Sequence, residues 1–321
     1  MELPHPCSEN MVSARIEDLI WKIEQDNTSG AVELTRKGAA VLALLTEETT
    51  APETSQFLSE LLSVGRKLIK AQPSMAPLFN LVNTVLSSVD TAEDAKEARN
   101  TAKAAAQNFA TALSVRGEKI GLEALSLISD GSTVLTHSHS STVLGAFLLA
   151  RARGRGFQVL CTESRPMEEG RELARELAQE GIEATLIIDS AVSHFMSQVN
   201  VVMVGADSIS RPGLVNKIGT YGVALASTAH EVPFYTLCGT EKFLPLDYPY
   251  LEIQQKDPRE VWDDYPEGVT VVNYYFDVTP LEYVSGLVTE KGILLRSQVE
   301  EMLSRLKVHK LLLERRRKSQ P

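Results

Sequence analysis

The sequence predicts an α/β protein in which a helical domain precedes a domain built on a parallel β-sheet. Residues 1–115 show helical periodicity without strand-like alternation. From Gly131 onward, short β-branched runs alternate with helical stretches, which is typical of a parallel sheet covered by helices. One of these runs, Val201–Val204, is apolar at every position, as expected for a strand buried on both faces. We therefore expect a helical domain over residues 1–115 and a Rossmann-like α/β domain over residues 116–321.

The helices of the first domain are predicted from the spacing of apolar residues. Ile16, Leu19, Ile20 and Ile23 recur at helical spacing, and a second apolar face includes Val41, Leu42, Leu44 and Leu45. Residues 91–113 are rich in alanine and contain no glycine or proline, which strongly favours a helix. The dipeptide Gln72-Pro73 should interrupt the helical pattern.

The strands of the second domain place polar residues at one edge of the sheet. Ligands bind beyond the carboxyl ends of the strands in open parallel sheets, so the residues that follow each run are candidates for a pocket. The predicted strands are Thr133–Thr136, Gln158–Thr162, Ala184–Asp189, Val199–Val204 and Phe234–Leu237.

Hydroxyl, acidic, basic and amide side chains follow these strands. A serine-rich turn containing Ser138, Ser140 and Ser141 opens a helix and could offer N–H groups and hydroxyls to a phosphate. Asp207 suits a general base or a partner for sugar hydroxyls. Asn216, Lys217 and Lys242 add an amide and two positive charges. Helix capping explains Ser140 and Ser141 equally well.

Other catalytic arrangements fit the sequence poorly. His137 and His139 alternate along one stretch, so they should point in opposite directions, and one of them should be structural. No third ligand stands at metal spacing, so we expect no zinc site and no other metal or cofactor. A serine hydrolase is disfavoured because no GxSxG motif is present.

Composition and charge limit the classes of binding partner and indicate the cellular compartment. The formal net charge of -10 argues against direct binding to nucleic acid or to an anionic membrane, and the basic run Arg315–Lys318 is interpreted as a solvated tail. No apolar stretch is long enough for a membrane span. Cys7, Cys161 and Cys238 are widely spaced, which fits reduced thiols in a cytoplasmic protein.

The residues from Gly131 to Leu294 resemble a known family. It comprises ribose-1,5-bisphosphate isomerase, methylthioribose-1-phosphate isomerase and the α, β and δ regulatory subunits of translation initiation factor 2B. The resemblance rests on segments in the family order and spacing, namely VLTHSHSS, CTESRP, IIDSAVSHFM, VGADSI, LVNKIGT and FDVTPLEYVSGLVTEKGI.

The resemblance implies a reaction and a departure from it. The isomerases use a Cys and an Asp to move a proton between adjacent sugar carbons. The Asp corresponds to Asp207, but the Cys corresponds to Ser138. A thiol with a pKa of about 8.5 is readily tuned for proton transfer, whereas a serine hydroxyl needs a dedicated partner base.

The resemblance also implies which residues contact a ligand. Ser140, Ser141, Asn216, Lys217 and Lys242 match ligand-contacting positions of the family. The isomerase RGA motif becomes Ser29-Gly30-Ala31, and a second phosphate-binding Arg becomes Gln72, so two bidentate phosphate anchors are absent unless Arg36 or Lys37 replaces them. Gly30 and Ala31 remain candidate ligand-binding residues.

Two functions remain open from the sequence. One is a non-catalytic regulatory protein, related to the factor 2B α subunit, that binds a sugar phosphate or a nucleotide. The other is an active aldose–ketose isomerase that uses Asp207 with an altered partner at position 138. The resemblance also implies a homodimer, which could associate further into a hexamer.

Overall fold

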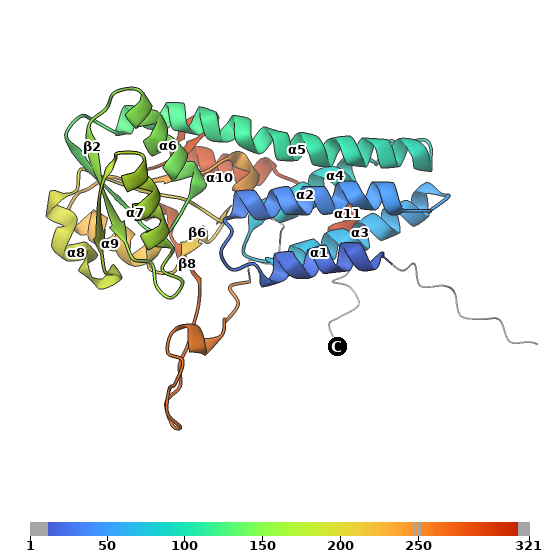
Figure 1. Cartoon of the computed structure of the whole chain (residues 1–321). Helices are drawn as coiled ribbons and strands as arrows, with labels where there is room; N and C mark the ends of the chain where they lie inside the picture. Colours follow the sequence, from blue (N-terminus) through green and yellow to red (C-terminus); the bar gives the residue numbers. More distant parts are fainter. Residues whose placement is uncertain (1–11, 247, 249–251, 314–321) are drawn as a thin grey trace, which may run out of the picture.

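The structure is a computed structural model that describes residues 12–246, 248 and 252–313. A bundle of helices lies beside a layered α/β part, and the long helix α5 extends along both (Figure 1). Cys7 and the basic run Arg315–Lys318 lie outside the described residues.

Five helices make up the N-terminal part. They are α1 (Ala14–Gln25), α2 (Ala31–Glu48), α3 (Thr54–Ala71), α4 (Ala76–Ser88) and α5 (Ala95–Ala124). The predicted helical character is confirmed, and Gln72-Pro73 lies in the break between α3 and α4. Because α5 continues to Ala124, the expected domain junction between residues 115 and 116 falls inside one helix.

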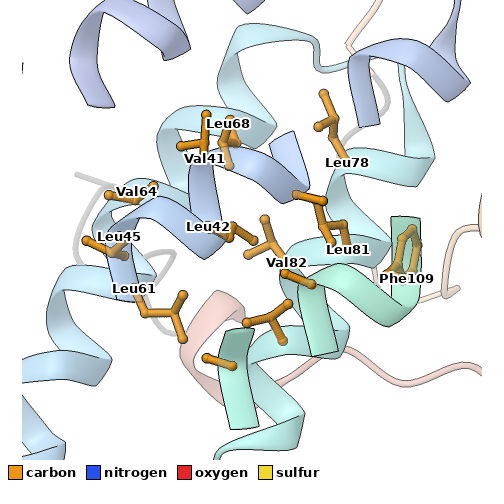
Figure 2. Close-up of a cluster of buried hydrophobic side chains, with 14 of the residues drawn as sticks. Val41, Leu42, Leu45, Leu61, Val64, Leu68, Leu78, Leu81, Val82 and Phe109 are labelled. Atoms are coloured by element: carbon orange, nitrogen blue, oxygen red, sulfur yellow. The ribbon is translucent and has the colours of Figure 1, made fainter. Parts of the chain in front are cut away.

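Buried aliphatic side chains hold this bundle together. Leu42, Leu61, Leu78 and Val82 belong to one cluster of buried side chains (Figure 2). Gly38 of α2 permits a close approach, because a Cβ at that position would lie 2.6 Å from Leu78 Cδ2. The bundle therefore has its own core. This core holds α2 in place, and the N-terminal end of α2 lies near the sheet.

The α/β part contains a seven-stranded sheet in the order β10-β9-β7-β4-β1-β2-β3, in which only β10 runs antiparallel to its neighbour. The five strands expected from the sequence are confirmed within one or two residues at each end. The strands are β1 (Ser132–Thr136), β2 (Phe157–Thr162), β3 (Glu183–Ile187), β4 (Val201–Val204), β7 (Phe234–Leu237), β9 (Gly286–Thr289) and β10 (Gly292–Leu294).

Helices cover both faces of this sheet, and successive strand residues point to opposite faces. Val134 of β1 packs in the core with the end of α5, α6 (Ser141–Ala152) and α7 (Glu169–Gln179). Leu135 packs in the core with α8 (Val192–Phe195), α9 (Thr220–Ala229) and α10 (Arg296–Arg305). The apolar strands are thus explained by two-sided burial. A short helix, α11 (Lys310–Leu313), follows α10.

The order of the strands places a crevice between β1 and β4. The chain runs outward from β1 through β2 to β3, then returns past β1 to β4 and continues to β7. The direction of winding reverses between β1 and β4, and ligands bind at such a reversal in open α/β sheets. Ser138 follows β1 and Asp207 follows β4, so the topology brings these two residues to the same crevice.

The sequence pattern did not predict a second sheet, which has three strands. It consists of β5 (Ser208–Ser210), β6 (Gly213–Lys217) and β8 (Phe276–Thr279) in antiparallel order. The sequence pattern predicted a helix directly after β4, whereas a hairpin comes first and α9 follows it. Asn216 and Lys217 therefore sit at the end of a strand rather than in a strand-to-helix loop.

Hydrogen bonds connect the helical part to the α/β part at the crevice. The Ala76 N–H at the start of α4 donates to the Asp207 carbonyl at 3.1 Å. The Asn80 amide donates to the carbonyls of Glu241 and Phe243 at 2.6 and 2.8 Å. Within the described part of the chain, no helix is long and apolar enough to cross a membrane.

Candidate functional site

A pocket of about 670 Å³ lies where the ends of β1 and β4 meet the helical part. Residues 27–32, at the start of α2, and Met75 line it from the helical side. The two strand ends are in close contact, because a Cβ on Gly205 would lie 2.6 Å from Ser140 Oγ. A glycine after β4 is therefore needed for the serine turn to reach the crevice.

The nine site residues expected from the sequence all line this pocket. Two come from the helical part and seven from the α/β part, so the site requires both. These residues are Gly30, Ala31, Ser138, Ser140, Ser141, Asp207, Asn216, Lys217 and Lys242.

Ser138 is held in an unusual backbone conformation. Its φ of 69° lies in the left-handed region, which non-glycine residues adopt rarely and often at functional sites. The Ser138 N–H donates to Ser164 Oγ at 2.8 Å. The Ser138 hydroxyl donates to Glu169 Oε1 at 2.8 Å. The serine thus has a carboxylate partner, which the sequence pattern did not reveal.

Glu169 begins α7 and bridges Ser138 to a buried lysine. Lys217 Nζ lies 2.9 Å from Glu169 Oε1 and 3.1 Å from Oε2. The side chain of Lys217 is only 6 % exposed, so little solvent screens this pair. The Lys217 ammonium also lies 5.0 Å from the centre of the Tyr275 ring, within cation–π range.

Asp207 has a carboxyl group suited to proton transfer. Burial raises its pKa from 3.8 to about 6, although the positive charges of Lys242 and Lys217 oppose the rise. Among the described residues, none donates a hydrogen bond to this carboxyl group. It is therefore available to a ligand, with a pKa near neutrality.

Lys242 contributes a second buried ammonium to the pocket. It follows β7 in a short 3-10 turn, Thr240–Lys242, and its Nζ donates to the Ala206 carbonyl. The preceding Glu241 is buried and paired with Arg116 of α5 at 3.2 Å. This ion pair ties the turn that carries Lys242 to the long helix.

Ser140 and Asn216 have local partners as well as pocket positions. Ser140 is the N-cap of α6, where its Oγ accepts a hydrogen bond from the Val143 N–H at 3.4 Å. The capping interpretation of Ser140 therefore applies, and the residue lines the pocket as well. Ser141, the first residue of α6, is exposed and also lines the pocket. The Asn216 amide donates to Thr220 Oγ1 at 3.0 Å.

The start of α2 presents backbone rather than arginine to the pocket. Gly30 is the N-cap of α2 and supplies no side-chain cap. The preceding turn is fixed by Asp26, which accepts hydrogen bonds from the N–H groups of Thr28 and Ser29 at 3.1 and 2.8 Å. Burial of Asp26 raises its pKa, but the hydrogen bond from Lys37 and those from the turn outweigh burial and lower it well below its usual value.

Gln72, at the position of one lost arginine, and the two possible replacements are engaged elsewhere. Gln72 donates to the Ile23 carbonyl at 2.9 Å and does not line the pocket. Arg36 donates to Ser114 Oγ at 2.9 Å, and Lys37 is held by Asp26 and Ser29. Neither basic side chain lines the pocket, so neither supplies the missing phosphate anchor in this arrangement.

The two histidines point to different surroundings, as expected from their alternation along the chain: His137 is buried and His139 lines the pocket. Burial lowers the pKa of His137, which favours the neutral ring. Its Nε2 lies 2.8 Å from the Ile218 carbonyl and its Nδ1 lies 2.6 Å from Thr162 Oγ1. Because a carbonyl only accepts, Nε2 carries the proton and Nδ1 accepts from the threonine. His139 instead lines the pocket and contacts Glu176 at 3.2 Å.

Sequence reasoning missed the pocket residues from α7 and the pocket residue that precedes β8. Glu169, Arg171 and Arg175 come from α7, and Tyr275 precedes β8. The α7 residues could have been found by extending the strand-end rule past Pro166 into the following helix. Tyr275 gave no local signal, because it reaches the site through long-range strand pairing. Within the described ranges, no group of three or more His, Cys, Asp or Glu side chains could hold a metal ion.

Comparison with known proteins finds relatives that match most of the chain. The chain is 34% identical over 284 residues to a ribose 1,5-bisphosphate isomerase of Methanocaldococcus jannaschii, covering 87% of this chain and 91% of the relative. It is 33% identical over 287 residues to a putative translation initiation factor eIF-2B subunit 2-like protein of Pyrococcus horikoshii, covering 89% and 98%.

Solved structures give the same result. A crystal structure of the Pyrococcus horikoshii OT3 translation initiation factor eIF-2B matches with a TM-score of 0.78 and 33% identity, over 89% of this chain and 98% of that one. A 5-methylthioribose 1-phosphate isomerase from Pyrococcus horikoshii OT3 has the same fold, with a TM-score of 0.70, 23% identity and coverage of 89% and 86%. The family model of the Initiation factor 2 subunit family matches residues 27–295, and the chain therefore belongs to that family.

Proposed function

We propose that the chain binds a phosphorylated sugar in the pocket between β1, β4 and α2, and that it acts as a regulatory protein related to the factor 2B α subunit. The observation that carries the proposal is the contact of Ser138 with Glu169, which is itself paired with Lys217. The position of the isomerase thiol is thus occupied by a hydroxyl that donates to a carboxylate, and this arrangement supports ligand recognition.

The charged and polar groups of the pocket suit the two halves of such a ligand. A phosphate is favoured at the buried ammonium of Lys242 and at the N–H groups in the first turn of α2, next to Gly30 and Ala31. Sugar hydroxyls can donate to the carboxylates of Asp207 and Glu169 and interact with the Asn216 amide. A nucleotide would use the same phosphate site.

Ligand binding at this position supports a regulatory role because both parts of the chain line the pocket. A bound sugar phosphate would connect α2 to the strand ends that also hold α4 through the Ala76–Asp207 hydrogen bond. We propose that the protein is cytoplasmic, that it self-associates as a homodimer or hexamer, and that it contacts neither nucleic acid nor membrane directly.

Calorimetry and a coupled turnover assay test the proposal. Ribose 5-phosphate should bind the purified chain and raise its melting temperature. Lys242→Met should weaken this binding, whereas Lys22→Met, on the exposed surface of α1, should leave it unchanged. The chain should not convert ribose 1,5-bisphosphate into ribulose 1,5-bisphosphate. Failure of every sugar phosphate to bind would overturn the proposal.

A second candidate function is sugar-phosphate isomerisation, which the state of Asp207 favours. Its carboxyl group has a pKa of about 6 and could accept a proton from a sugar carbon, while the Ser138–Glu169 pair exchanges a proton with the neighbouring oxygen. Turnover by the wild-type chain that Asp207→Asn abolishes, with binding retained, would replace the regulatory proposal by this one.

A further inference from the structure

Glu169 places a carboxylate in the wall of the pocket, beside Ser138 and Lys217. It lies in the first turn of α7, where the helix dipole favours a negative charge. Its two oxygens are engaged by Ser138 and Lys217, and 23% of its side chain remains exposed. Lys217 is therefore neutralised within the pocket by a partner that belongs to the pocket wall.

The two arginines of the pocket are also paired with carboxylates. Four basic side chains line it, together with five acidic side chains. Arg171 pairs with Glu168, and Arg175 pairs with Glu172. Among the described lining residues, Lys242 is the basic side chain with no carboxylate partner, since its ammonium donates to the Ala206 carbonyl. A phosphate can therefore approach Lys242 without breaking an ion pair, although the carboxyl groups of Asp207 and Glu241 are close enough to interact with its charge.

We propose that Glu169 sets the charge of the ligand, so that the pocket accepts a sugar monophosphate in preference to a sugar bisphosphate. The inference rests on the proposed function. The single phosphate lies at Lys242, and the part formed by Ser138, Glu169 and Lys217 receives an uncharged hydroxyl-bearing end of the sugar.

Electrostatics explains the preference. Each phosphate carries about -1.5 to -2 charges near neutral pH, so a second phosphate beside Glu169 would meet a like charge in a poorly screened environment. To bind it, Lys217 would have to leave a buried ion pair and leave the carboxylate uncompensated. A sugar hydroxyl meets no such penalty, because it donates a hydrogen bond to the carboxylate.

Isothermal titration at low ionic strength tests the inference with ribose 1-phosphate, ribose 5-phosphate and ribose 1,5-bisphosphate. On the wild-type chain, at least one monophosphate should bind more tightly than the bisphosphate. Glu169→Gln keeps the shape of the side chain and removes its charge. It should raise the affinity for the bisphosphate by about tenfold or more, with a smaller change for the monophosphate.

Glu180→Gln is the matched control, because it removes the same charge at the end of the same helix, outside the pocket. It should leave the preference unchanged. Tighter binding of the bisphosphate by the wild-type chain would overturn the inference and leave the proposed function in place, and so would an equal effect of both variants. Absence of binding by any of the three sugar phosphates would overturn the proposed function itself. The comparison of ligands on the wild-type chain decides the matter even where a variant fails to fold.

Discussion

The hydroxyl of Ser138 donates a hydrogen bond to Glu169 over a distance of 2.8 Å, and Glu169 pairs in turn with Lys217. The contact joins the end of β1 to the start of α7, and the sequence resemblance places the isomerase thiol at position 138. It also satisfies the serine without any ligand.

Ser138→Cys tests whether the missing thiol alone separates this chain from the isomerases. Asp207 already provides a carboxyl group with a pKa of about 6, and a thiol beside Glu169 would stay protonated and able to donate. We expect turnover of a ribose phosphate to appear above the wild-type level, measured by the formation of the ketose product.

The control for this gain is Ser138→Ala, which removes the hydroxyl and adds no acid. It should bind ligand and show no turnover. Ser138→Cys could prove as inactive as the alanine variant while both bind ribose phosphates. In that case the missing thiol does not explain the lack of turnover, and the absent arginine anchors explain it instead.

The raised pKa of Asp207 predicts a pH-dependent stability. Its folded value of about 6 exceeds the unfolded value of 3.8, so the stabilising contribution is complete below about pH 4 and is lost as the pH rises through 6. A shift of about two units corresponds to about 3 kcal/mol. Asp207→Asn should therefore be more stable than wild type at pH 8, by about 1–3 kcal/mol after allowance for burying the amide.

Thermal unfolding from pH 4 to pH 8 measures this effect. The difference in melting temperature between Asp207→Asn and wild type should shrink toward pH 4. Asp263→Asn, on an exposed loop, should follow the wild-type profile throughout. A difference that is constant with pH would show that the Asp207 carboxyl has the same pKa in the folded and unfolded chains.

Gly170 determines where Glu169 can lie. A Cβ on Gly170 would be 1.8 Å from the Thr162 carbonyl oxygen, which is a backbone atom at the end of β2 and cannot move aside. Gly170→Ala should push α7 away from the sheet, lower the free energy of unfolding by about 1–3 kcal/mol, and weaken sugar-phosphate binding. Chemical denaturation and calorimetry measure the two effects.

Gly145→Ala in α6 is the matched comparison, because a Cβ there meets no atom within 4 Å. Alanine is the better helix former, so this variant should be more stable by about 0.5–1 kcal/mol. Equal effects of the two substitutions would mean that helix propensity, and not the approach of α7 to β2, explains the glycine at position 170.

The α/β class, five of the seven strands of the main sheet and the edge of the sheet where the site lies all follow from the amino-acid sequence. These features are local or topological. Two-sided burial appears as apolar runs such as Val201–Val204, and the strand-end rule needs only the residue that follows each run. For this reason, Ser138 and Asp207 could be assigned to one pocket from the order of the residues alone.

The contacts that those residues make depend on how distant segments pack. Ser138 and Glu169 are 31 residues apart, and Glu169 and Lys217 are 48 apart. No periodicity encodes such pairs, because the sequence does not state how far α7 lies from β2 or that β6 runs in a second sheet. The continuation of α5 through residue 115 also depended on packing, since its second half is held by α6 and the sheet. Long-range packing thus turned a predicted set of polar residues into a pocket in which Lys217 is paired with Glu169 while Asp207 and Lys242 have no ion pair with any described residue.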